Sequence, residues 1–190
     1  MITQATRHVD MIVSPEALPR MIPEQYLAYE RDQQIRHELV DGYLYALTGA
    51  SDRHEEIALN LAAALRVHLR GTQCRVYKGD LKIREADDFY YPDVFVRCNE
   101  ERGDPYFKTD PVLIAEVLSP GTQRYDRGDK SLAYFSLPTL REYVLISQDQ
   151  IRVDVYRLSA LARSERLESA GDVLKLASVD FTITLGELYE

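Results

Sequence analysis

The alternation of apolar and polar residues predicts a chain in which strands outnumber helices. Two strand-like runs meet at an Asp-Gly pair within residues 35–48, and Asp-Gly favours a two-residue hairpin turn with positive φ. Residues 51–70 carry Ile or Leu at every fourth position from 57 onward, which is the periodicity of an amphipathic helix. Ser51 can cap this helix and Gly71 can end it. The pattern therefore begins with a β-hairpin followed by a long helix.

Short strands then dominate the rest of the chain. The remaining predicted strands are residues 74–78, 81–84, 91–98, 112–118, 142–147, 151–158 and 173–176, and the remaining helices are residues 24–31 and 126–137. The tail, residues 181–189, is typical of a strand followed by a short turn of helix. Because strands dominate and helices interrupt them, we expect an α/β fold with a mixed β-sheet and helices packed on its faces.

Length and composition are those of one globular domain. The 190 residues are 45% hydrophobic and 28% charged, and they contain no internal repeat, low-complexity tract or long linker. A chain of this length buries enough surface to be stable without an added staple. We expect residues 1–20 to be an irregular N-terminal segment and residues 21–190 to form a single domain.

The sequence also excludes several classes of protein. No apolar run approaches 18 residues, and residues 1–20 contain no apolar core of a signal peptide, so neither a membrane span nor a secretory signal is expected. Cys74 and Cys98 form no CxxC pair, which argues against a disulfide scaffold and a cysteine zinc site. This cysteine usage favours a reducing compartment, and we expect a cytoplasmic protein. P-loop, dinucleotide-binding and GxSxG motifs are absent from the sequence.

Acidic residues dominate the net charge but are unevenly distributed. A formal charge of −8 argues against a broad electrostatic nucleic-acid binder. Residues 66–84, however, contain six basic residues and only Asp80 as an acid. This stretch can form a local basic patch that contacts phosphates. A solvated helix end and strand would explain the same residues equally well.

Two carboxylates lie in segments that otherwise have the pattern of buried strands. Glu116 is surrounded by six apolar residues in 112–118, and the strand period places it on the same face as Ile114 and Leu118. An ionised carboxylate there costs several kcal/mol in desolvation unless it is paired or binds a cation. Asp93 lies at the start of an earlier apolar strand, so the two carboxylates can lie side by side on adjacent strands.

Paired carboxylates of this kind suit a hard divalent cation. Two such groups repel each other and are difficult to ionise alone. Mg²⁺ typically takes one or two carboxylates and completes its shell with water and phosphate oxygens. A bound ion of this kind makes water easier to deprotonate and polarises a phosphoryl group. The alternatives are a salt bridge from Glu116 to an arginine and a turn-capping role for Asp93.

Three further residues can complete such a site. Lys130 borders the apolar face of the helix predicted at 126–137 and can reach inward, with an ion pair to Asp126 as the alternative. His54 faces the sheet from the first turn of the long helix, where it can be a general base, a substrate contact or a satisfied core histidine. Glu38 lies on a predicted hairpin strand and gives a weaker signal.

Several short motifs occur in an order that resembles a known family. They are His37-Glu-Leu-Val-Asp-Gly42, Ala50-Ser-x-x-His54, Tyr90-Tyr-Pro-Asp-Val94, Ala115-Glu-Val-Leu-Ser-Pro120 and Arg124-Tyr-Asp-Arg-Gly-Asp-Lys130, followed by Glu142-Tyr-Val-Leu145. From about residue 26 to residue 189, the sequence resembles the Uma-type family of restriction endonucleases, within the PD-(D/E)XK nuclease superfamily. The order and spacing of the motifs carry this resemblance, because each motif alone is weak.

The resemblance implies a restriction-endonuclease-like fold, with a mixed central sheet flanked by helices and a Mg²⁺ site at one sheet edge. Mn²⁺ is expected to substitute for Mg²⁺. The catalytic residues that it implies are Asp93, Glu116, Lys130, His54 and Glu38, of which the three carboxylates are the expected metal ligands. In the superfamily pattern a lysine stands two residues after the Glu, where this chain has Leu118. Activity therefore depends on Lys130 reaching the site from its helix.

The expected function is that of a metal-dependent endonuclease that hydrolyses phosphodiester bonds of nucleic acid, with DNA as the expected substrate. The expected nucleic-acid contacts are Arg75, Lys78, Lys82, Arg84 and Arg124. A homodimer is expected for double-strand cleavage, which needs two sites. Overall acidity and the displaced lysine favour an alternative, a catalytically inactive nuclease-fold module that binds nucleic acid or a protein partner. A hydrolase acting on a different phosphodiester is the third hypothesis.

Overall fold

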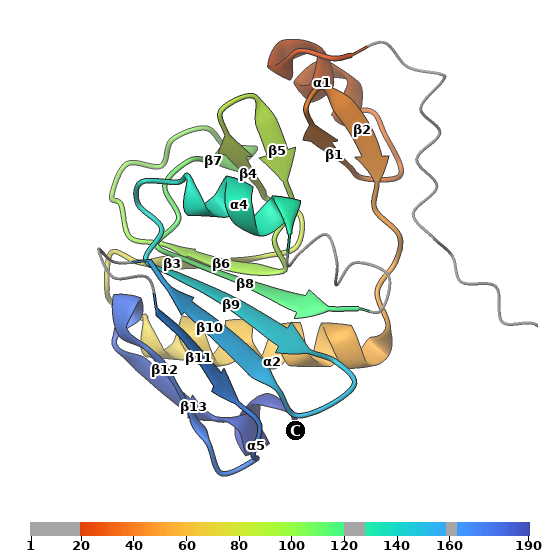
Figure 1. Ribbon diagram of the computed structural model, residues 1–190. Helices are drawn as coiled ribbons and strands as arrows, with labels where there is room; N and C mark the ends of the chain where they lie inside the picture. The colour runs from red at the N-terminus through yellow and green to blue at the C-terminus, as the bar shows by residue number, and fades with distance from the viewer. Residues whose placement is uncertain (1–19, 120–127, 159–162) are drawn as a thin grey trace, which may run out of the picture.

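The computed structural model describes residues 20–119, 128–158 and 163–190, and strands dominate these ranges (Figure 1). The helices are α1 (Pro23–Glu30), α2 (Asp52–His68), α4 (Asp129–Phe135) and α5 (Leu185–Leu188), with a 3₁₀ turn at Ala177–Val179. The strands are β1 (His37–Val40), β2 (Tyr43–Ala46), β3 (Arg75–Lys78), β4 (Lys82–Glu85), β5 (Asp88–Tyr90), β6 (Val94–Arg97), β7 (Phe107–Lys108), β8 (Leu113–Leu118), β9 (Glu142–Ser147), β10 (Val153–Arg157), β11 (Arg163–Leu167), β12 (Val173–Leu176) and β13 (Phe181–Thr184). Apart from its last residue, the predicted N-terminal segment 1–20 lies outside the described residues, as does Arg124.

A six-stranded mixed sheet forms the centre of the fold. Its order is β11-β10-β9-β8-β6-β3, in which β8 and β9 run parallel and the other neighbours are antiparallel. In Figure 1, α4 lies above this sheet and α2 below it. The residues of β8 are buried on both faces, as expected for a strand between two helical layers. The predicted mixed sheet with helices on its faces is therefore confirmed.

Helix α2 forms where the sequence predicts it, because its apolar residues fall on one face. Ile57, Leu61 and Leu65 are fully buried against the central sheet, and each such side chain contributes about 1.5 to 3 kcal/mol of burial free energy. The Ser51 hydroxyl caps the helix by accepting a hydrogen bond of 3.2 Å from the amide of His54. Among the helices of the described ranges, none is both long and apolar enough to cross a membrane.

The predicted hairpin joins a second sheet of five short strands in the order β2-β1-β5-β4-β7. Its turn has positive φ at Asp41 (51°) and Gly42 (81°), as the Asp-Gly pair predicts. A Cβ atom at Gly42 would lie only 3.1 Å from the Cβ of Arg20, so a side chain would also be crowded there. This sheet places Glu38, on β1, close to the edge of the central sheet.

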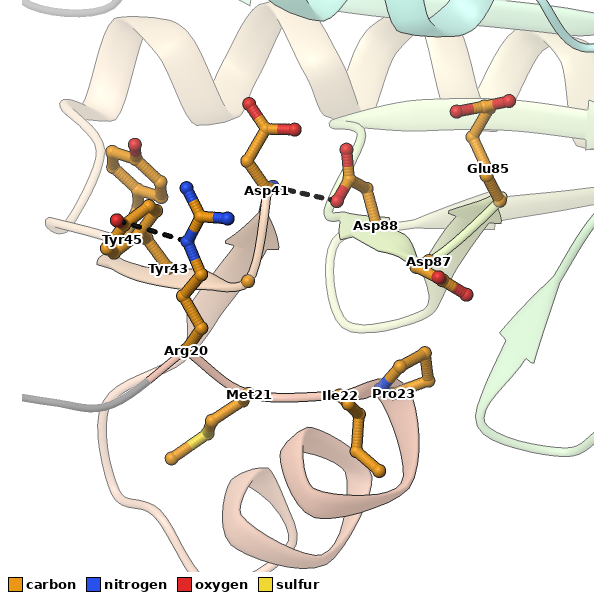
Figure 2. Close-up of a pocket in the computed structure, with 12 residues that line it drawn as sticks. Arg20, Met21, Ile22, Pro23, Asp41, Tyr43, Tyr45, Glu85, Asp87 and Asp88 are labelled. Atoms are coloured by element: carbon orange, nitrogen blue, oxygen red, sulfur yellow. Dashed lines mark hydrogen bonds between the residues drawn. The ribbon is translucent and has the colours of Figure 1, made fainter.

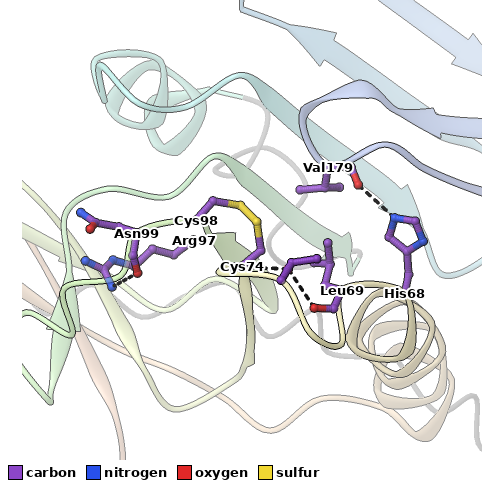
Figure 3. Close-up of a disulfide and its surroundings, with 8 residues drawn as sticks. His68, Leu69, Cys74, Arg97, Cys98, Asn99 and Val179 are labelled. Carbon is purple, nitrogen blue, oxygen red and sulfur yellow. Dashed lines mark hydrogen bonds between the residues drawn. A yellow bond between two sulfur atoms is a disulfide. The ribbon is translucent and has the colours of Figure 1, made fainter.

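Cys74 and Cys98 form a disulfide next to the first residue of β3 and the last residue of β6 (Figure 3). The antiparallel register pairs Arg75 with Arg97, so the two cysteines that flank these strands face each other, and their Cα atoms lie 3.9 Å apart. This bridge was not predicted from the sequence, whose cysteine usage argued against a disulfide scaffold and for a reducing compartment, because a separation of 24 residues does not reveal strand register. The reducing compartment stays an expectation that the bridge does not support.

Candidate active site

Asp93 and Glu116 lie side by side because β6 and β8 are antiparallel neighbours. Val94 pairs with Ala115, so the preceding residue of β6 meets the following residue of β8. The amide of Asp93 donates a hydrogen bond of 3.1 Å to Glu116 Oε2, and the amide of Val117 donates one of 2.7 Å to Asp93 Oδ2. Each carboxylate is thus fixed by the main chain of the neighbouring strand.

The Asp93 carboxylate faces a pocket of about 490 Å³, called the site pocket here. Glu116, His54, Lys130 and Lys78 also line it. The Asp93 side chain is 24% exposed, and within the described residues its Oδ1 atom makes no hydrogen bond. This oxygen is therefore available to a ligand in the site pocket, although the rest of the site is buried.

Lys130 joins two buried carboxylates that are 78 residues apart in the chain. Its Nζ atom lies 3.0 Å from Glu38 Oε1 and 3.0 Å from Glu116 Oε1. All three side chains are almost completely buried, with exposed fractions of 6%, 2% and 4% for the lysine, Glu38 and Glu116. The lysine therefore reaches the strand carboxylate from helix α4, as the displaced motif requires.

Tyr134 is a site residue that the sequence analysis did not predict. Its hydroxyl donates a hydrogen bond of 3.1 Å to Glu116 Oε1, the same oxygen that contacts Lys130. Burial raises the pKa of Tyr134 well above its ordinary value, so the hydroxyl stays a neutral donor. The available signal was its position four residues after Lys130, which places both side chains on one face of α4.

Tyr91 connects Glu38 with a second layer of buried polar groups. The amide of Tyr91 donates a hydrogen bond of 2.8 Å to Glu38 Oε1, and its hydroxyl donates one of 3.1 Å to Glu30 Oε1. Lys82 Nζ lies 3.3 Å from the same hydroxyl, and burial lowers the pKa of Lys82. These contacts join β1 and α1 to the segment between β5 and β6.

His54 approaches Asp93 from the first turn of α2. Its Nε2 atom lies 3.2 Å from Asp93 Oδ2, whereas its buried Nδ1 atom makes no hydrogen bond with the described residues. Burial lowers the pKa of His54, but the hydrogen bond to Asp93 and the negative charge of that carboxylate outweigh burial, so the pKa is raised. The geometry gives His54 a direct contact with Asp93 and a second nitrogen with unused hydrogen-bonding capacity.

Comparison with known proteins identifies the family. Residues 23–186 match Uma2, whose description is "Putative restriction endonuclease". The chain belongs to the Uma2 family. This match includes every residue of the site geometry described above and overlaps the predicted resemblance up to residue 186.

Two relatives of this Uma2-family chain come from Synechocystis sp. (strain ATCC 27184 / PCC 6803 / Kazusa). The "Uncharacterized protein slr1290" is 36% identical over 181 residues, which cover 93% of this chain and 95% of the relative. The "Uncharacterized protein sll1609" is 32% identical over 138 residues, which cover 70% of this chain and 78% of the relative.

A solved structure supports the fold. A "putative nuclease belonging to DUF820" from Anabaena variabilis ATCC 29413 superposes with a TM-score of 0.75 at 16% identity, over 89% of this chain and 97% of its own. The fold class is therefore that of a restriction-endonuclease-like nuclease, as predicted, and membership of Uma2 makes the chain a member of a nuclease family.

The residues predicted to contact nucleic acid do not form one patch. Lys78 lines the site pocket, where it pairs with Glu55 at 2.5 Å. Lys82 is buried against Tyr91. Arg84 lies over the rings of Phe89 and Phe107, and Arg75 lines a different pocket beside the disulfide. The basic stretch is therefore divided among several surfaces, with Lys78 as its contribution to the site pocket.

The donor set at Asp93 and Glu116 fits Mg²⁺ better than a transition metal. Across the described ranges, no group of three or more His, Cys, Asp or Glu side chains is arranged to hold a metal ion. Mg²⁺ does not need such a cage, because it is usually bound by one or two carboxylates plus water and substrate phosphate. Two carboxylates beside a pocket, one of them with an unused oxygen, meet that requirement.

A larger pocket of about 900 Å³ lies at the turn of the hairpin (Figure 2). Acidic side chains line it, with Asp41 and Asp88 facing each other across a hydrogen bond from the Asp41 amide to the Asp88 carboxylate. Burial raises the pKa of Glu85 and of Asp88. This larger pocket contains none of the predicted site residues, and its acidic lining disfavours the binding of phosphate.

Proposed function

We propose that this Uma2-family chain is a metal-dependent endonuclease that hydrolyses phosphodiester bonds, with DNA as its substrate. The observation that carries the proposal is the pairing of Asp93 with Glu116 on adjacent strands of the site pocket, with Lys130 Nζ 3.0 Å from Glu116. Carboxylates next to a lysine supply both a cation site and a donor for developing negative charge, which phosphodiester hydrolysis needs.

Asp93 and Glu116 would hold Mg²⁺, with Mn²⁺ able to substitute. When bound, the ion polarises the phosphoryl group and makes water easier to deprotonate. Glu38 is proposed as a further carboxylate of the site. Its contact with Lys130 supports a second task, which is to hold that lysine beside Glu116.

Lys130 would donate a hydrogen bond to the attacking water or to a phosphate oxygen. Tyr134 keeps Glu116 in place by donating a hydrogen bond to its Oε1 atom, the oxygen that also contacts Lys130. His54 holds Asp93 through Nε2, and its unused Nδ1 is available to a water or phosphate once side chains shift to admit substrate. Lys78, on the wall of the site pocket, would contact the phosphate next to the one that is cleaved.

The test is cleavage of plasmid DNA and of single-stranded DNA in Mg²⁺ or Mn²⁺, comparing the wild type with Asp93→Asn. Asparagine keeps an oxygen for the Val117 amide but removes the charge that a cation requires. Asp87→Asn is the matched control, because Asp87 is exposed in the larger acidic pocket. Metal-dependent cleavage should be lost in Asp93→Asn and kept in the control.

Equal, metal-independent cleavage by the wild type and Asp93→Asn would contradict the proposal. The inactive-module hypothesis predicts a different result, namely DNA or protein binding that survives Glu116→Gln with no cleavage under any metal. Hydrolysis of other phosphodiesters but not DNA would keep the site and change the substrate. Light scattering with and without duplex DNA tests whether double-strand cleavage uses a homodimer.

A further inference from the structure

Three arginines surround the Cys74 side of the disulfide. Arg66, Arg70 and Arg75 line a pocket of about 320 Å³ together with Cys74, and no acidic side chain lines it. We call it the arginine pocket. It lies where helix α2 ends and strand β3 begins, beside the disulfide drawn in Figure 3. It therefore combines concentrated positive charge with a reactive sulfur group.

Local structure explains how the arginine pocket forms. Gly71, with a φ of +84°, turns the chain after α2, and the Thr72 hydroxyl donates a hydrogen bond of 2.8 Å to the carbonyl of Leu69. The Cys74 amide then donates to the Thr72 hydroxyl at 3.1 Å. These contacts fold the loop back, so that Arg75 on β3 lies next to the last turn of α2.

Helix stability alone does not explain this grouping. Arg66 and Arg70 near the end of α2 interact favourably with the helix dipole. Arg75 is on a strand, so the dipole does not account for it. Within the described part of the chain, none of the three guanidinium groups makes an ion pair or a hydrogen bond to another side chain. Three arginines that share a pocket without counter-ions favour an anionic ligand.

The disulfide is accessible to such a ligand. Cys74 and Cys98 are both partly exposed, and Cys74 is the one that lines the arginine pocket. Nearby positive charge lowers the pKa of a thiol and stabilises the thiolate that takes part in disulfide exchange. The same charge raises the local concentration of anionic reagents.

We propose that the arginine pocket binds small anionic thiols and disulfides of the glutathione type, and that these exchange with the Cys74–Cys98 bridge. The proposal is independent of the nuclease activity. Four residue pairs of the β3–β6 ladder separate the bridge from Asp93, so neither the ligand nor the exchange involves the site pocket.

The exchange is balanced without a further reactant. The thiolate of the bound ligand attacks Cys74 Sγ, the bond between Cys74 and Cys98 breaks, and Cys98 leaves as a thiolate that takes up a proton from water. A second ligand thiolate then attacks the ligand sulfur of the mixed disulfide. Cys74 leaves as a thiolate, and the two ligand molecules depart as their own disulfide. The two ligand thiols are thus oxidised by the loss of two electrons, and these electrons reduce the protein bridge.

The test measures how fast the full chain, with its bridge intact, is reduced by glutathione and by 2-mercaptoethanol, which has no charged group besides its reacting thiolate. Reaction samples are alkylated and the two cysteines are followed by mass spectrometry. The ratio of the two rates should fall by roughly threefold in Arg70→Gln and in Arg75→Gln, because each removes one exposed charge contact. Arg31→Gln, an exposed arginine at the end of α1, should leave the ratio unchanged.

Varying the ionic strength tests the same role of charge without any substitution. Raising the ionic strength should lower the glutathione rate of the wild type more than the 2-mercaptoethanol rate, since both reagents attack as thiolates but only glutathione carries additional carboxylates that screening affects. A ratio that is the same in the wild type, both variants and high salt would overturn the proposal. So would variants that weaken DNA binding while the ratio stays constant, because the arginines would then contact a nucleic-acid backbone.

Discussion

The main-chain amide of Asp93 donates a hydrogen bond to the carboxylate of Glu116. The main chain of β8 returns one to Asp93 through the amide of Val117. This reciprocal pair means that strand register, rather than side-chain packing, sets the separation of the two carboxylates. We therefore expect isosteric amide variants, which keep an oxygen acceptor for these main-chain amides, to preserve the strand pairing while removing a charge.

Removal of Lys130 should destabilise the fold as well as abolish cleavage. Its ammonium lies between the buried carboxylates of Glu38 and Glu116, and losing one partner of a buried ion pair typically costs about 3 to 5 kcal/mol. We expect Lys130→Met to lower the free energy of unfolding by an amount in this range. Urea unfolding monitored by circular dichroism measures it.

A double variant separates charge imbalance from lost packing. Glu38→Gln combined with Lys130→Met removes one negative charge together with the positive one, so it should recover part of the stability that Lys130→Met loses. Cleavage should stay absent in both variants. A double variant as unstable as the sum of the two single variants would show that the charges are not coupled, contrary to the contact of 3.0 Å.

Tyr134→Phe should reduce turnover more than it reduces substrate binding. The substitution removes the hydroxyl that donates to Glu116 Oε1 but keeps the buried ring. Loss of a group that positions a metal-binding carboxylate typically costs about 10- to 100-fold in metal affinity or activity. We expect a fall of this size in kcat at saturating Mg²⁺, with KM for DNA almost unchanged. Tyr143→Phe is the matched control, because its ring also packs against Tyr134 in the same core. Equal losses in both variants would indicate a general packing effect.

The sequence predicts those elements whose apolar pattern is strong. The strands expected at 142–147 and 173–176 have the same bounds in the structure as β9 and β12. Strands β5 and β7 are only three and two residues long, too short for a periodic pattern. Strand β11 is mostly polar and forms only because β10 offers a hydrogen-bonding edge to it. Missed elements are therefore those stabilised by their neighbours rather than by their own residues.

The same distinction applies to the candidate site. Glu116 could be identified because a charge within an apolar strand is anomalous by itself. Its contacts with Lys130 and Tyr134 depend on how α4 packs on the sheet, and the Glu38 contact depends on where the hairpin sits. The Cys74 bridge depends on strand register in the same way. Local pattern gives the residue types, whereas their distances arise only from tertiary packing.

Asp110 should contribute stability that is lost in acid. Burial raises the pKa of Asp110, but hydrogen bonds from Arg97 and Asn99 and the charge of the arginine outweigh burial, so the pKa lies below the ordinary value of 3.8. A carboxyl with a lowered folded-state pKa stabilises the protein fully above its unfolded-state pKa and loses this contribution as the pH falls through the folded-state value.

Asp110→Asn should therefore be less stable than the wild type near neutral pH, and the difference should shrink as the pH falls from about 5 towards about 2. Urea midpoints across this pH range measure the effect. Asp104→Asn serves as the control, because Asp104 is exposed between β6 and β7 and takes part in no ion pair among the described residues, although Lys82 and Lys108 lie near enough to interact with its charge. A stability difference that does not change with pH would mean that ionisation of Asp110 does not contribute to the free energy of unfolding.

Reduction of the Cys74–Cys98 bridge should lower the free energy of unfolding, because the unfolded chain gains conformational freedom when the bridge is broken. The bridge closes a loop of 24 residues, for which the chain-entropy estimate is about 3 kcal/mol. The four-pair β3–β6 ladder remains after reduction, so the folded structure should persist. We expect the reduced protein and Cys98→Ser to share a lower free energy of unfolding, measured in urea with and without dithiothreitol. Dithiothreitol should not change Cys98→Ser further, whereas a fall in that variant would point to an effect of the reagent itself. Equal stability of the oxidised and reduced wild type would show that the unfolded chain is not restrained by the bridge.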